Sequence, residues 1–189
     1  MKKILFISFS CCILFSLMAK AQRIETLLEK NWKFTKGEVA EAMEPEFDDR
    51  KWETVTVPHD WAIFGPFDRS NDLQEVAVTQ NFEKKASVKT GRTGGLPYVG
   101  IGWYRTTFDA PADQQTTLVF DGAMSEAHVY VNGQEACFWP FGYNSFHCDV
   151  TGLLNKDGKN NTLAVRLENK PQSSRWYPGA GLYRNVRVV

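Results

Sequence analysis

Three stretches of this 189-residue chain gather side chains that could bind a small polar molecule. The first is Val57-Pro58-His59-Asp60-Trp61. Here Asp60 could accept hydrogen bonds from sugar hydroxyls while Trp61 offers an apolar face to a pyranose ring. In the structural alternative, Asp60 caps backbone N–H groups in a turn and Trp61 fills the core. Catalysis by a His59–Asp60 dyad is disfavoured, because it needs a third partner and because adjacent side chains in extended backbone point to opposite faces.

The second and third stretches are aromatic loops. Residues 175–181, Arg-Trp-Tyr-Pro-Gly-Ala-Gly, combine aromatic rings with glycines that permit close approach of a ligand. Trp176 could stack on a sugar ring, or the loop could pack back onto the fold with Arg175 or Arg184 paired to an internal carboxylate. Residues 139–144, Trp-Pro-Phe-Gly-Tyr-Asn, place Asn144 where it could hydrogen-bond a hydroxyl, although such loops more often close the end of a sandwich. Both loops keep two interpretations open.

No complete metal or phosphate motif accompanies these stretches. His147-Cys148 lacks a second pair of zinc ligands, and residues 155–160 lack the acidic residue that completes a calcium loop. Residues 91–95 contain three glycines but not the Lys-Ser/Thr ending of a phosphate-binding loop. The sequence therefore predicts neither a metal nor another cofactor.

The elements that must position these residues are strands. From Ile101 onward apolar and polar residues alternate, as in the run 162–168, and Asn132-Gly133 predicts a two-residue hairpin turn. Many short strands separated by turns predict an all-β jelly-roll or galactose-binding-like β-sandwich. The expected strands are 103–108, 117–120, 127–131, 134–138, 146–150, 162–168 and 183–189, with a less regular start near 27–34. Residues 64–102 predict a long loop, either functional or disordered.

The first 21 residues have the pattern of a secretory signal. Two lysines precede a 15-residue apolar run, which is shorter than the ~20 residues of a spanning helix, and Ala19-Lys20-Ala21 supplies small residues at the cleavage spacing. We therefore expect export to the periplasm or cell surface and no membrane attachment after cleavage. A retained anchor is the alternative. The remaining domain would be residues 22–189.

Charge and cysteine content narrow the function classes. Lys plus Arg and Asp plus Glu both total 22, so nucleic-acid binding is not expected. Only Cys137 and Cys148 follow the signal. In an oxidising compartment they could form a disulfide, worth roughly 3 kcal/mol on the loop-entropy model, or remain two buried thiols.

Taken in order, the motifs resemble the amino-terminal sugar-binding domain of glycoside hydrolase family 2, which contains β-galactosidases, β-glucuronidases and β-mannosidases. The Pro-His-Asp-Trp and Trp-Tyr-Pro-Gly forms look most like exported β-galactosidases of gut-type Bacteroidetes. The resemblance covers nearly all of residues 27–189 and is carried by Val57–Trp61, Gly100–Arg105, Phe120–Gly122, Ala127–Gly133, Gly142-Tyr143, Asp149–Thr151 and Trp176–Val186.

The resemblance implies a jelly-roll module followed by an immunoglobulin-like domain and a (β/α)₈ barrel on which it packs. Two barrel glutamates would perform retaining hydrolysis, so no catalytic residue is assigned within residues 1–189. Asp60, Asn144, Arg175 and Trp176 are the residues expected to reach the carbohydrate, and galactose is the first candidate. The extra polar stretch from Leu73 to Arg92 departs from many galactosidases and could alter which sugar is admitted. A free-standing carbohydrate-binding module or lectin is the alternative.

Overall fold

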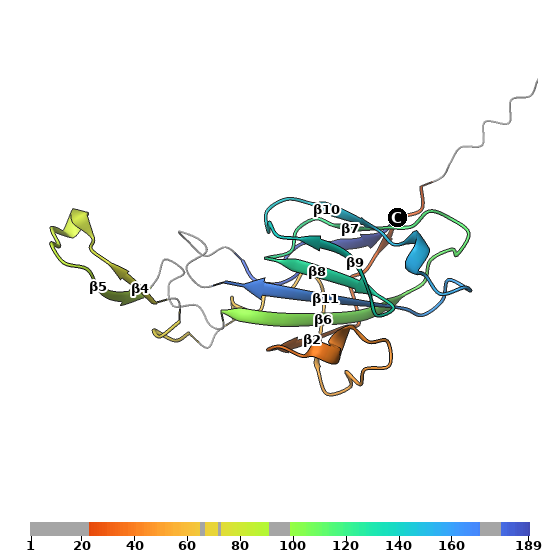
Figure 1. The fold of residues 1–189 in the computed structure, drawn as a ribbon, viewed down its shortest axis with the longest axis horizontal. Helices are drawn as coiled ribbons and strands as arrows, with labels where there is room; N and C mark the ends of the chain where they lie inside the picture. Colours follow the sequence, from red (N-terminus) through yellow and green to blue (C-terminus); the bar gives the residue numbers. More distant parts are fainter. Residues whose placement is uncertain (1–22, 65–66, 72, 91–98, 171–178) are drawn as a thin grey trace, which may run out of the picture.

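The computed structural model describes residues 23–64, 67–71, 73–90, 99–170 and 179–189. The predicted signal (1–21) and the site residues Arg175 and Trp176 lie outside the described residues. Two antiparallel sheets form the body (Figure 1). The larger has the order β3 (Glu53–Val55), β2 (Trp32–Lys36), β6 (Gly100–Phe108), β11 (Asn161–Asn169), β8 (Ala127–Val131), β9 (Gln134–Trp139). The smaller has the order β1 (Thr26–Leu27), β12 (Val186–Val188), β7 (Thr117–Phe120), β10 (Phe146–Asp149).

The core lies between these sheets and follows the predicted alternation. On β8, residues 127, 129 and 131 are buried and residues 128 and 130 are half-buried. Large apolar side chains from both sheets are fully buried, among them Trp32, Tyr104, Leu118, Phe120 and Leu163. The all-β sandwich expected from the sequence is therefore confirmed.

The predicted hairpin between β8 and β9 is confirmed. Asn132 and Gly133 have φ angles of 50° and 80°, as a type I′ turn requires. The Asn132 amide also donates to Leu153 O and to Asn161 Oδ1, at 2.8 and 3.0 Å. The turn is thereby tied to the 3₁₀ segment η3 (Thr151–Leu153) and to the start of β11.

One face of the larger sheet is more buried than strand alternation predicts. Ala164 is fully buried, although the pattern placed it on the polar face of β11. The covering comes from the segment around η1 (Ala40–Met43), whose Ala42 packs with Trp103 and Ala164. Arg105 holds this segment in place: it pairs with Asp49 at 2.9 Å and donates to three backbone carbonyls, at residues 42, 44 and 45.

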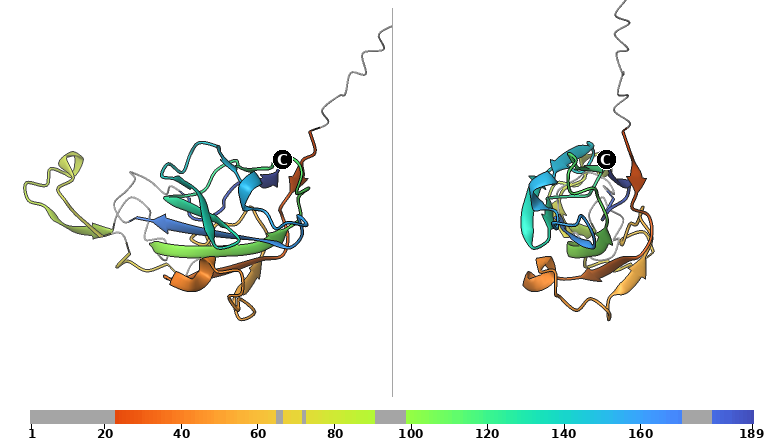
Figure 2. Two further views of the ribbon diagram at one scale, coloured as in Figure 1. Left: turned by 45° about the vertical axis from the view of Figure 1, so that its right-hand side comes forward. Right: turned by 90° about the vertical axis from the view of Figure 1, so that its right-hand side faces the viewer.

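The expectation of one long loop over residues 64–102 is wrong in part, because the described residues include a third, two-stranded sheet. It pairs β4 (Leu73–Val76) with β5 (Ser87–Thr90), and its connection carries η2 (Thr79–Asn81). Figures 1 and 2 show this hairpin projecting beyond the sandwich, at the end opposite the carboxyl terminus. The described part of the extra polar stretch from Leu73 to Arg92 therefore forms a hairpin that projects from the sandwich.

Cys137 and Cys148 form a disulfide, which decides the question that the sequence left open. Cys137 is on β9 of the larger sheet and Cys148 is on β10 of the smaller one. The bridge therefore fastens the two sheets together beside the loop 139–145.

Candidate functional site at the loop end

Four segments meet at the end of the sandwich nearest the hairpin, and we call them the loop cluster: residues 56–64, 121–126, 139–145 and 179–185. Backbone hydrogen bonds join the first to the last, from Trp61 N to Ala180 O at 3.2 Å and from His59 N to Leu182 O at 2.8 Å. Met124 and Gly181 exchange two further backbone bonds, each of 3.0 Å. These bonds therefore hold the first, second and fourth segments together.

The structural alternative is correct for Trp61. This indole is only 3% exposed and stacks on Phe34, with ring centroids 5.5 Å apart and an interplanar angle of 18°. Gly102 makes room for it, because a Cβ there would lie 2.7 Å from the indole. The interpretation of Trp61 as an exposed platform for a sugar is wrong.

Asp60 is half-buried and has a turn-capping role. Its Oδ1 accepts a hydrogen bond of 2.9 Å from the backbone N–H of Ala62. The residue also lines a cavity of about 710 Å³ together with His59, Ile63 and Phe64. Capping by one carboxylate oxygen does not prevent the residue from lining this cavity, so Asp60 stays a predicted carbohydrate contact.

His59 is bound to the core rather than presented as a free base. Its Nδ1 lies 2.8 Å from the hydroxyl of Tyr104, a fully buried residue. Burial lowers the pKa of His59, and the nearby Lys36 acts in the same direction, while the carboxylates of Glu53 and Asp60 oppose the shift. The imidazole is therefore held toward its neutral form and fixed in orientation.

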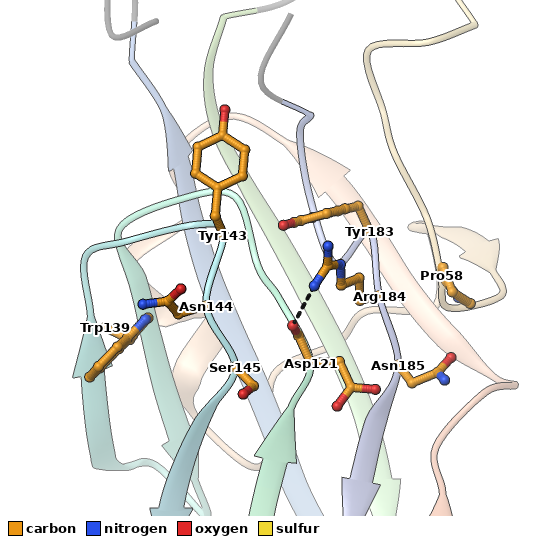
Figure 3. A pocket seen from close by; sticks show the side chains of 9 residues that line it. All are labelled: Pro58, Asp121, Trp139, Tyr143, Asn144, Ser145, Tyr183, Arg184 and Asn185. Carbon is orange, nitrogen blue, oxygen red and sulfur yellow. Dashed lines mark hydrogen bonds between the residues drawn. The ribbon is translucent and has the colours of Figure 1, made fainter.

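Asn144 lines a second cavity, of about 820 Å³, shown in Figure 3. Pro58 and Tyr183 line both cavities, so the two are neighbours. The hydroxyl of Tyr183 donates to the carbonyl of Gly142 at 2.7 Å and fixes the loop 139–145 against the last segment of the cluster. The lining residues are Pro58, Asp121, Trp139, Tyr143, Asn144, Ser145, Tyr183, Arg184 and Asn185.

Several polar side chains around Asn144 make no hydrogen bond within the described part of the chain. The side chains of Asn144, Ser145 and Asn185 have no hydrogen-bond partner among the described residues. Trp139 Nε1 is buried and also has none within that part of the chain, a situation that costs about 1–3 kcal/mol. Arg184 lies over the Tyr183 ring, 5.3 Å from its centroid, and makes one long contact of 3.5 Å with Asp121 O. The arrangement is suited to bind an oxygen-rich molecule.

The structure thus divides the sequence-predicted site. Asp60 and Asn144 lie in adjacent cavities rather than in one pocket. The sequence motifs did not indicate Asp121 and Asn185 as site residues. In the sequence these two residues are distinguished only by their position at a strand end, next to the candidate loops. In the described residues, no group of three or more His, Cys, Asp or Glu side chains could hold a metal ion. No helix in that part of the chain is long and apolar enough to cross a membrane.

The sandwich and its loop cluster define a galactose-binding-like β-sandwich domain. Residues 101–177 match the family described as glycosyl hydrolase 2 galactose-binding domain-like. The chain belongs to this family of amino-terminal domains of glycoside hydrolase family 2.

Relatives in both sequence and structure cover most of this chain. A β-galactosidase of Bacteroides ovatus is 36% identical over 179 residues, which are 93% of this chain and 19% of that protein. A protein of Formosa agariphila described as a putative β-glucuronidase is also 36% identical, over 95% of this chain and 16% of its own length.

Among solved structures, a β-glycosidase from Bacteroides vulgatus matches with a TM-score of 0.73 and 28% identity, over 88% of this chain and 20% of that one. A β-glucuronidase of Bacteroides uniformis matches with a TM-score of 0.66 and 29% identity, over 88% and 18%. The chain therefore spans about a fifth of the length of the relatives it matches.

Proposed function

We propose that this chain is the amino-terminal domain of an exported retaining β-glycosidase and does not hydrolyse glycosides by itself. The match along nearly the whole chain to about a fifth of a β-galactosidase is the observation that carries the proposal. Hydrolysis in such an enzyme would be performed by two carboxylates of a barrel domain outside residues 1–189. The domain would contribute carbohydrate contacts from the loop cluster, with Asp60, Asn144, Arg175 and Trp176 as the proposed residues.

Exposed apolar side chains support packing against such a barrel. Ile63, Phe64 and Phe67 are 54%, 83% and 63% exposed, and Ile63 and Phe64 also line the Asp60 cavity. On the projecting hairpin, Phe82 and Val88 are 89% and 66% exposed. Exposed large apolar side chains of this kind are common at interfaces between domains. We infer that this surface and the hairpin face the catalytic domain and limit which sugars reach it.

A β-galactoside is the first candidate substrate, and a β-glucuronide is the alternative. The two relatives described above act on these different sugars according to their names and are equally similar to the chain, each 36% identical. The disulfide between Cys137 and Cys148 supports export, because such bonds persist in oxidising compartments. The amino-terminal pattern of residues 1–21 supports the same location.

A domain exchange tests the proposal. Residues 22–189 replace the matching segment of the Bacteroides ovatus β-galactosidase, and the hybrid is assayed with nitrophenyl galactoside and glucuronide. We expect a folded, active hybrid whose KM changes when Asp60 or Asn144 is replaced by alanine. Alanine at Lys156, which lies in a turn away from the loop cluster, is the matched control and should leave KM unchanged. A folded hybrid without activity would contradict the proposal.

A further inference from the structure

The cavity around Asn144 is lined by polar side chains that a ligand could contact. One guanidinium, two amides and one hydroxyl come from Arg184, Asn144, Asn185 and Ser145, whereas the Trp139 Nε1 is buried. The Asp121 carboxylate, the anionic group of this lining, is already paired with Arg187. The guanidinium can only donate, so a ligand that fits this wall must offer it an acceptor.

The charge of the lining points in the same direction. Asp121, the carboxylate of this lining, is paired with Arg187, which also contacts Glu25, so the Arg184 guanidinium has no carboxylate partner among the described residues. Among the described residues, the Arg184 guanidinium makes one long hydrogen bond, of 3.5 Å to Asp121 O, and most of its five N–H groups have no partner there. A free guanidinium is the side chain best suited to bind a carboxylate through two parallel hydrogen bonds. An acidic ligand is favoured over a neutral one.

The remaining groups suit a sugar ring. Tyr143 is 41% exposed at the edge of the cavity and packs edge-to-face on Phe141, with ring centroids 5.4 Å apart, which fixes an aromatic face beside the amides. Figure 3 shows the Trp139 nitrogen on the side of the indole nearest Asn144. Exposed amides bind hydroxyls in either direction, and an aromatic face binds the C–H side of a pyranose.

We propose that this cavity binds a uronic acid residue, with Arg184 on the carboxylate and Asn144 and Asn185 on the ring hydroxyls. The inference deepens the proposed function, because it assigns an acidic sugar to a place in the domain where the sequence predicted only a hydroxyl contact by Asn144. The cavity would hold an acidic unit of a glycan independently of the bond that the enzyme cleaves.

Methyl β-glucuronide and methyl β-glucoside are a matched pair of probes, because they differ in the group at C6. Each is titrated into the purified chain while amide and indole N–H signals are followed by NMR. The indole signal of Trp139, assigned with the variant Trp139→Phe, reports on this wall directly. We expect the glucuronide to shift it and to bind about fivefold more tightly than the glucoside, the upper range for an exposed ion pair.

Two substitutions separate the charge from the cavity. Arg184→Gln should abolish the preference for the glucuronide, while Asn144→Ala should weaken both ligands. Arg50→Gln is the control, since Arg50 is exposed and pairs with Asp48 outside the cavity. Added salt should weaken the glucuronide alone.

Equal affinity for the two probes, or shifts confined to residues outside this wall, would overturn the proposal. The result is independent of the domain exchange, because binding is measured on the chain itself. An active hybrid combined with no uronate binding would refute this inference alone. Uronate binding combined with an inactive hybrid would refute the proposed function alone.

Discussion

Removing the disulfide between Cys137 and Cys148 should cost about 3 kcal/mol of folding free energy. The two residues are 11 apart in the sequence, so the bond closes a short loop. The loop-entropy relation then gives about 9 cal/mol/K, or about 3 kcal/mol at 25 °C. For a domain of this size, that loss lowers the melting temperature by about 6–12 °C.

The assay is denaturant unfolding of the wild type, oxidised and reduced, beside the double variant Cys137→Ala, Cys148→Ala. The reduced wild type isolates the cross-link, because it retains both sulfur atoms, whereas the variant also loses a side chain at the buried Cys148, which is 1% exposed. We expect the reduced protein to be less stable than the oxidised one and the variant to be slightly less stable again. Coincident unfolding curves for oxidised and reduced protein would refute the reasoning.

Three further predictions concern the framework of the loop cluster and the sheet behind it. Arg105→Met should destabilise the fold by about 3 kcal/mol in urea, because it leaves the partly exposed Asp49 carboxylate and three carbonyls without their guanidinium partner. Gly181→Ala should lower the folding stability by at least about 2 kcal/mol, since the φ of Gly181 is +105° and a Cβ there would lie 2.7 Å from the carbonyl oxygen of His59. Gly37→Ala is the control, because Gly37 has a φ of +100° with open space around it, and this variant should lose less stability in the same assay. Because burial lowers the pKa of His59 in the folded state, the unfolded state takes up its proton first, and stability should fall as pH drops below about 6.5. His59→Gln should remove that part of the pH dependence, and an unchanged profile between pH 5 and 7 would count against the assignment.

The sandwich could be predicted because its signals are local. Alternation along residues 127–131 and the Asn132-Gly133 turn each depend on neighbours in the sequence, and both are confirmed. The burial of Ala164 could not be predicted in this way. It depends on a segment more than 100 residues earlier in the chain, around Ala42, which covers that face of the sheet.

The candidate site was only partly predictable for the same reason. Asp60 and Asn144 are both at the loop end, but they line two neighbouring cavities, which share Pro58 and Tyr183 as lining residues. Trp61 is a residue type that could stack on a sugar, yet its side chain lies in the core, because Gly102 on β6 leaves room for the indole. The hairpin formed by β4 and β5 was not predicted, because its strands have four residues each and contain few apolar residues.

The most direct test of the account is turnover by the purified chain itself. Nitrophenyl galactoside and glucuronide are incubated with the chain at high concentration, beside a sample denatured beforehand. We expect no release of nitrophenol above that blank, because we propose that the bond-cleaving carboxylates lie in another domain. Turnover that is lost when His59 or Asp60 is replaced would contradict it, since the chain would then be a complete hydrolase.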